Sequence, residues 1–84
     1  KNLINQKKHK ISFETAAYVF QDKNYIEMYD FEHSTEEDRY IAIGCVGEVL
    51  FVVFTERKEN IRLISARLAT ESERRLYYDQ NIYY

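Results

Sequence analysis

Residues 61–78, "IRLISARLATESERRLYY", pass from an apolar segment through a threonine into a helix-like segment. The first part is rich in aliphatic and β-branched side chains, which predicts a strand at 61–68. Thr70 and Glu73 have the T-x-x-E spacing of a capping box, which predicts that a helix begins there. Two arginines interrupt the strand and two more lie in the helix. This junction therefore has more positive charge than a core strand requires.

Three more segments of strand length precede the junction, at 25–31, 38–46 and 48–56. Each is mostly apolar or alternates apolar and polar residues, as strands do. Gly47 and the polar residues "RKEN" at 57–60 predict tight turns between consecutive strands. Together with 61–68, these segments predict an antiparallel meander of four strands.

Two helices are expected before the strands. Residues 1–10 resemble a polar helix, and Ser12 is a candidate N-cap for a second helix over 13–22. A stripe of side chains at helical spacing predicts the buried side of that second helix: Phe13, Ala16, Ala17 and Phe20. The order ααββββα predicts an α+β fold, with two N-terminal helices and one C-terminal helix packed on the sheet. We expect residues 1–84 to form a single domain.

Composition excludes several classes of protein. Cys45, His9 and His33 are scattered, so no metal-ligand spacing exists and we expect neither a metal nor a cofactor. No apolar run approaches the roughly 18–20 residues that span a bilayer, and no secretory signal opens the chain. We therefore expect a cytoplasmic protein without membrane contact. A formal charge of −2 argues against nonspecific nucleic-acid coating, and direct sequence-specific DNA binding is not expected without a helix-turn-helix pattern.

The charge is unevenly distributed. Residues 22–38 contain seven acidic groups and one lysine, a net charge of −6, whereas the other 67 residues have 11 basic and seven acidic groups, a net charge of +4. Such a surface can bind an anion on its basic side. The acidic segment can equally be a solvated hairpin at the sheet edge, and both interpretations stay open.

Strand parity indicates a face for binding. The segment 48–56 is apolar at both parities: Val49, Phe51 and Val53 on one face, Leu50, Val52 and Phe54 on the other. Such a strand is expected to be covered on both faces, and three short helices are too few to cover both faces of four strands. We therefore expect part of one face to meet a partner, a second subunit or a ligand.

The segment 61–68 has its own alternation. Regular geometry predicts one face with Ile64, Ala66 and Leu68, and an opposite face with Leu63, Ser65 and Arg67. Arg62 then lies on the side opposite Arg67, unless a β-bulge intervenes.

Five stretches, in this order, resemble one known family: "KHKISFETAAYVF" (8–20), "EEDRYIAIG" (36–44), "VVFTER" (52–57), "IRLISAR" (61–67) and "ATESERRLYY" (69–78). Together they are similar to the BrnT family, the toxins of bacterial type II toxin–antitoxin pairs. The resemblance implies a RelE-like fold and metal-independent endoribonuclease activity on mRNA. It also implies neutralisation by a BrnA-type antitoxin, with a homodimer or a heterotetramer among the possible assemblies. Family members usually begin with a short strand and a tryptophan–aspartate pair. Both are absent from this chain, which would leave an unpaired sheet edge.

Metal-free RNA cleavage uses the neighbouring 2′-hydroxyl as nucleophile and needs cations at the phosphate. Arginine suits that task because its planar fork can contact two phosphate oxygens. Arg67 is the first candidate, and the alternative is an ion pair with Glu73 or Glu71. Arg62 is a weaker candidate because of its parity. Arg39 is a third, and its alternative is a local pair with Glu36 or Asp38.

Proton transfer requires a different side chain, because arginine stays protonated. His9 is the candidate, since unperturbed histidine titrates near neutral pH, and the alternative is a surface or capping histidine. Glu73 is a second possible base, although its position is explained as a helix cap. His33, in the acidic segment, is predicted to be a surface residue. The candidate RNA contacts are Lys8, Ser65, Arg74, Tyr77 and Tyr78, with solvation or packing as the alternative for each.

The leading hypothesis is therefore an endoribonuclease toxin that cleaves mRNA and inhibits translation. The competing hypothesis is a non-catalytic interaction module that docks a basic, DNA-binding partner through its sheet face.

Overall fold

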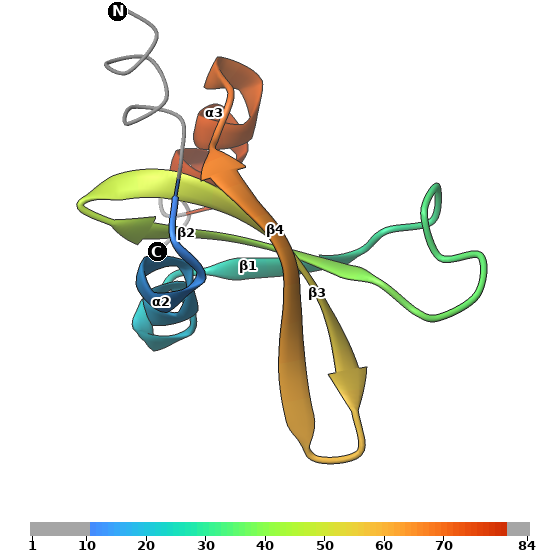
Figure 1. Ribbon diagram of the computed structural model, residues 1–84. Helices are drawn as coiled ribbons and strands as arrows, with labels where there is room; N and C mark the ends of the chain where they lie inside the picture. Colours follow the sequence, from blue (N-terminus) through green and yellow to red (C-terminus); the bar gives the residue numbers. More distant parts are fainter. Residues whose placement is uncertain (1–10, 81–84) are drawn as a thin grey trace, which may run out of the picture.

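The structure, a computed structural model, describes residues 11–80 (Figure 1). Its elements, in order, are α2 (Phe13–Ala16), the 3-10 helix η1 (Ala17–Gln21), β1 (Ile26–Tyr29), β2 (Tyr40–Val46), β3 (Glu48–Arg57), β4 (Asn60–Leu68) and α3 (Glu71–Asp79). The four strands form one antiparallel sheet in the order β1-β2-β3-β4, which confirms the predicted meander. The helix expected at 1–10 lies outside the described residues. No described helix is long and apolar enough to cross a membrane.

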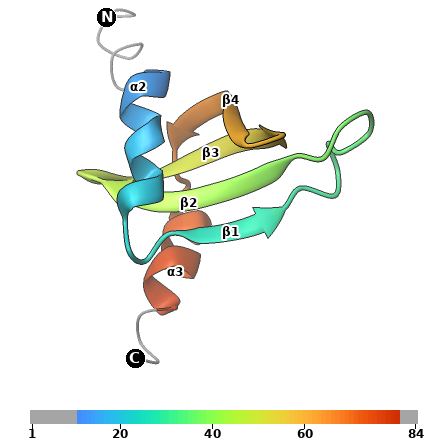
Figure 2. The ribbon, with the colours of Figure 1, turned by 90° about the horizontal axis from the view of Figure 1, so that it is seen from below.

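The helices pack on opposite faces of the sheet (Figure 2). We call the face under α2 and η1 the α2 face; its core includes Ala16 and Val19 packed on Val52 and Phe54. We call the other the α3 face, where Tyr77 of α3 packs against Ile43 and Val49. Both helices lie at the same end of the sheet, away from the β1–β2 loop (Figure 1). The far end of the α3 face therefore has no helix over it, and Val53 there is partly exposed.

The predicted buried stripe of the second helix is wrong in part. Ser12 does cap the helix, since its Oγ accepts a hydrogen bond from the backbone N–H of Thr15. Phe13 is 49% exposed and Ala17 is also exposed, whereas Ala16 and Val19 are fully buried. The reason is that the α-helix tightens into a 3-10 helix at Ala17, and a 3-10 helix places residues i and i+3 on the same side.

Close packing explains a glycine in β2. A Cβ atom built on Gly44 would lie 2.9 Å from Cγ1 of Val19 and 3.0 Å from Cβ of Tyr25. Only a residue without a side chain lets η1 approach the sheet this closely.

A β-bulge in β4 changes the predicted alternation. Val53 pairs with Ser65 and Phe54 with Leu63, so Ile64 is the extra residue. Leu63 therefore turns to the α2 face, where it packs with Ala66 and Leu68 against the core. The prediction that Leu63 shares a face with Ser65 and Arg67 is wrong for this reason.

The predicted start of the last helix is confirmed. Thr70 is the N-cap of α3: its Oγ1 accepts a hydrogen bond from the N–H of Glu73, and the Glu73 carboxylate accepts one from the N–H of Thr70. This reciprocal capping box fixes where β4 ends and in which direction α3 leaves the sheet.

Candidate active site

The bulge gathers polar and cationic side chains of β4 on the α3 face. Phe51, Val53 and Thr55 alternate along β3 and pair with Arg67, Ser65 and Arg62. Directly paired residues share a face, so Arg62 lies on the same side as Arg67. The sequence analysis placed Arg62 opposite Arg67 unless a β-bulge intervened, and the bulge is present. Arg62 and Ser65 are both exposed.

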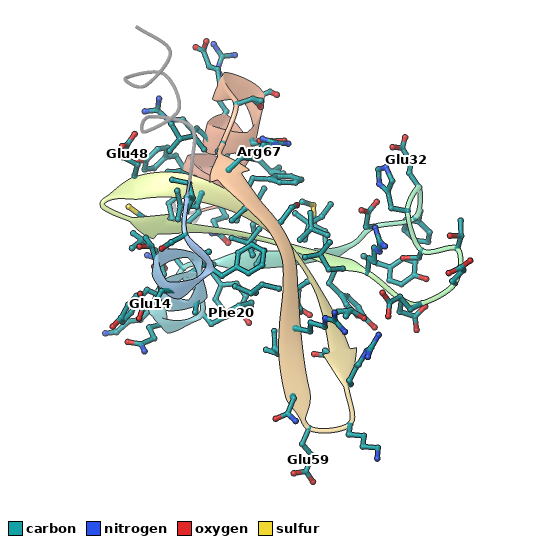
Figure 3. All side chains as sticks on the ribbon, in the orientation of Figure 1. Glu14, Phe20, Glu32, Glu48, Glu59 and Arg67 are labelled. Carbon is teal, nitrogen blue, oxygen red and sulfur yellow. The ribbon has the colours of Figure 1, made fainter. Side chains whose placement is uncertain are left out.

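Arg67 is held in place by three contacts. Its Nη1 and Nη2 donate to the two carboxylate oxygens of Glu73, at 2.9 and 3.0 Å. Nη1 also donates to the carbonyl oxygen of Leu68, and the guanidinium carbon lies 3.9 Å from the centre of the Phe51 ring. Figure 3 shows Arg67 near the end of β4, beside the start of α3. This ion pair with Glu73 is the role that the sequence analysis gave for Arg67 as the alternative to phosphate binding.

Glu73 has a lowered pKa because of this arrangement. The hydrogen bond from Arg67 is the main cause, the N–H of Thr70 adds to it, and partial burial opposes it. Glu73 is therefore a carboxylate that caps α3 and neutralises Arg67. A group in that state is a poor proton acceptor near neutral pH, which argues against Glu73 as the general base.

A pocket of about 190 Å³ opens at the far end of the α3 face. We call it the Arg39 pocket; its lining residues come from the β1–β2 loop, β3 and β4, and are Asp30, His33, Arg39, Val53, Ile64 and Ser65. The bulge contributes directly to this pocket, because both Ile64 and Ser65 lie opposite Val53. Two residues that the sequence analysis singled out, Arg39 and Ser65, thus meet here from distant parts of the chain.

Arg39 does not form the local ion pair that the sequence analysis gave as its alternative role. Within residues 11–80 no carboxylate, Glu36 and Asp38 included, lies within 4.0 Å of its guanidinium. Its Nε atom is buried and has no hydrogen-bond partner among the described residues. Because Arg39 lines the pocket and no described carboxylate neutralises its guanidinium, its positive charge is available to an anion bound there.

His33 is exposed, as the sequence analysis predicted, and it also lines this pocket. Its Nδ1 lies 3.0 and 3.2 Å from the two carboxylate oxygens of Asp30, a residue only 8% exposed. In the sequence, only the D-x-x-H spacing of "DFEH" (30–33) indicated this pair. Asp30 is one of seven acidic residues in the segment 22–38, so the sequence did not single it out as the partner of His33.

The candidate RNA-contacting residues of α3 lie away from the Arg39 pocket. Arg74 and Tyr78 line a separate pocket of about 220 Å³ beside Gly47 and Glu48, at the helix-covered end of the sheet. Arg75 is exposed and lies 3.4 Å from Glu71. These side chains can contact an extended ligand that crosses the surface, but they do not meet the Arg39 pocket.

Tyr77 packs in the core, which is the alternative to RNA contact that the sequence analysis gave for it. It is 4% exposed, and its hydroxyl donates a hydrogen bond to the Asp22 carboxylate. Burial and this hydrogen bond both raise the pKa of Tyr77. Its ring is enclosed between α3 and the sheet, so the hypothesis that Tyr77 stacks on RNA bases conflicts with its position.

His9 and Lys8 lie outside the described residues, so the expectation that His9 and Arg67 share a pocket stays a prediction. Residues 11–80 contain no group of three or more His, Cys, Asp or Glu side chains arranged to hold a metal ion.

The fold and site together define an α+β protein with arginines along one face of its sheet. The family model for BrnT, the ribonuclease toxin of type II toxin–antitoxin systems, matches residues 1–73. The chain therefore belongs to the BrnT family, as the sequence resemblance indicated, and its class implies an antitoxin as partner. A comparison with curated proteins finds no match.

Proposed function

We propose that this protein is a metal-independent endoribonuclease toxin of RelE-like fold. It cleaves mRNA through the 2′-hydroxyl in the cytoplasm, inhibits translation, and is neutralised by a BrnA-type antitoxin. The observation that supports this most is the Arg39 pocket on the α3 face, in which a guanidinium without a carboxylate partner among residues 11–80 lies beside an exposed serine. Arg62 and Arg67 on the same face extend the positive charge along β4.

We assign the roles of the described residues from their contacts, and those of His9 and Lys8 from the family resemblance. Arg39 is the main phosphate ligand, because its guanidinium has no carboxylate partner within residues 11–80. Arg67 contributes less charge, since Glu73 neutralises it, and it positions the strand-to-helix junction. His9 takes part in proton transfer. Lys8, Ser65, Arg74 and Tyr78 contact the flanking RNA.

The test is cleavage of a single-stranded RNA by the purified full chain in excess EDTA. We expect products that end in a 2′,3′-cyclic phosphate, and no cleavage of the same sequence with 2′-deoxyribose throughout. The Arg39→Ala variant is expected to lose about 10²- to 10³-fold in kcat/KM, the effect of removing one preorganised group that stabilises the transition state. Arg75→Ala is the matched control, an exposed arginine paired with Glu71 outside the pocket, and is expected to cleave normally.

The alternative is a non-catalytic module that docks a basic, DNA-binding partner through the sheet face. Phe31 favours it, because this aromatic residue is 85% exposed within the acidic segment 22–38. Intact RNA together with a stable complex with the antitoxin would support this module and refute the nuclease.

A further inference from the structure

We propose that His33 is the general base of this site and that Asp30 is the residue that positions it. This inference rests on the proposed ribonuclease function and deepens it by naming the group that accepts the proton of the 2′-hydroxyl. Glu73, the base considered from the sequence, is occupied by Arg67 and by the cap of α3. His33 is the histidine of the described chain, and it lines the same pocket as Arg39.

The geometry determines which ring nitrogen is available. Nδ1 of His33 is the atom next to the Asp30 carboxylate, at 3.0 Å from Oδ2. A carboxylate only accepts hydrogen bonds, so Nδ1 is protonated, and the proton-accepting lone pair of the neutral ring is on Nε2. The His33 side chain is 63% exposed whereas that of Asp30 is 10% exposed, so the ring can contact a ligand while its partner stays in the protein.

The loop is built to hold this pair. The N–H of Asp30 donates to the carbonyl oxygen of Arg39 at 2.8 Å, which extends the β1–β2 ladder to the pocket. The Ser34 Oγ donates to the carbonyl oxygen of Asp30 at 2.6 Å and accepts from the N–H of Arg39 at 2.9 Å. His33 is therefore fixed between two residues tied to the ladder, and Arg39 belongs to the same hydrogen-bond network.

The step that this arrangement supports is transesterification at phosphorus. Nε2 of His33 removes the 2′-hydroxyl proton, the O2′–P bond forms, and the P–O5′ bond breaks. The leaving 5′ oxygen takes up a proton from solvent water. Arg39 stabilises the charge on the non-bridging oxygens, and Asp30 stabilises the imidazolium that forms, as a carboxylate does for a catalytic histidine elsewhere. The products are a 2′,3′-cyclic phosphate and a 5′-hydroxyl.

Kinetics provide the first test. His33→Ala is expected to lower kcat by about 10²- to 10⁴-fold with little change in KM, the effect of one positioned base. Thr35→Ala, in the same loop and exposed, is the control and is expected to keep its activity. Asp30→Asn keeps the shape of the side chain and is expected to lower kcat more than it raises KM.

Nitrogen NMR of the imidazole provides a second readout that does not depend on turnover. In the wild type we expect the His33 tautomer with protonated Nδ1, and in Asp30→Asn a mixture of tautomers. An RNA with fluorine in place of the 2′-hydroxyl at every position, which cannot react, is expected to shift the His33 Nε2 signal in the wild type and not in Arg39→Ala.

The outcomes separate the two proposals. If the wild type cleaves RNA and His33→Ala cleaves at a similar rate, His33 is not the base, and the ribonuclease function stands. If the wild type leaves RNA intact, both proposals fall. A wild-type His33 signal that the unreactive RNA does not move also overturns the assignment, even where His33→Ala fails to fold.

Discussion

At the scale of single residues, Asp22 joins three parts of the fold. It is the C-cap residue of η1, and its carboxylate accepts hydrogen bonds from the N–H of Cys45 in β2, at 2.8 Å, and from the hydroxyl of Tyr77 in α3. The N–H of Asn24 donates a third. Burial alone would raise the pKa of Asp22, but these hydrogen bonds outweigh it and the pKa is lowered. Asp22 is therefore a partly buried anchor between the two helices and not a free acid.

Replacing Tyr77 by phenylalanine tests this anchor. The change removes one hydrogen bond to a carboxylate and keeps the ring, so the free energy of unfolding is expected to fall by about 1.5–3 kcal/mol in urea titration. Tyr78→Phe is the matched control. Tyr78 is 49% exposed, and its hydroxyl has no hydrogen bond within the described residues, so a change below about 0.5 kcal/mol is expected. Equal losses in both variants would contradict the anchor.

At the scale of elements, the β3–β4 hairpin determines the site. Its bulge at Ile64 brings Arg62 to the α3 face and opens the Arg39 pocket next to Ser65. Its turn is a two-residue connection between the paired residues Arg57 and Asn60. Lys58 in this turn has a φ of 55°, the left-handed region that costs an ordinary L-residue roughly 1–2 kcal/mol.

Lys58→Gly is expected to stabilise the protein. Glycine removes the steric cost of the left-handed backbone, and its larger loss of chain entropy on folding offsets part of the gain. We expect a net increase of about 0.5 kcal/mol in the free energy of unfolding. Glu59→Gly is the control in the same turn, where φ is negative, and it is expected to be neutral or destabilising. A loss of stability in Lys58→Gly would mean that the turn is not strained.

At the scale of the whole molecule, the acidic β1–β2 loop and the strand-to-helix junction lie at opposite ends of the sheet. The acidic β1–β2 loop, which includes Glu32, lies at one end, and Arg67 and α3 lie at the other (Figure 3).

Two carboxylates that link elements, Asp22 and Glu73, both have pKa values below the ordinary values of 3.8 and 4.5. A folded-state pKa below the unfolded one gives stability that is present above the unfolded pKa and is lost as the pH falls through the folded pKa.

The protein is therefore expected to hold a steady free energy of unfolding from about pH 7 to about pH 5 and to lose stability below about pH 4.5. Glu73→Gln is expected to be less stable than the wild type at pH 7, with a flatter decline in acid. Glu71→Gln is the control, because the Glu71 side chain is 82% exposed and makes one weak ion pair. Urea titrations at about pH 7, 5 and 3 measure the free energy of unfolding of the wild type and both variants. If stability fell equally with pH in all three proteins, Glu73 would not be the source of the acid sensitivity.

The local sequence determined the elements of this protein. The order of the meander, the Ser12 cap and the Thr70–Glu73 capping box follow from side-chain periodicity and from hydrogen bonds within three residues, whereas the first strand is shorter than the predicted 25–31. The family could also be identified from short stretches in their order along the chain.

Only the tertiary structure decided which side chains meet. Strand alternation has a period of two, so the single extra residue Ile64 moved Leu63 and Arg62 to the faces opposite those predicted. Likewise, His33 became a candidate base through its contact with a buried carboxylate and through a pocket that residues of β3 and β4 complete from 20 or more positions away in the sequence. Such contacts depend on strand register and burial, which arise only when distant segments pack. Local periodicity therefore cannot predict them.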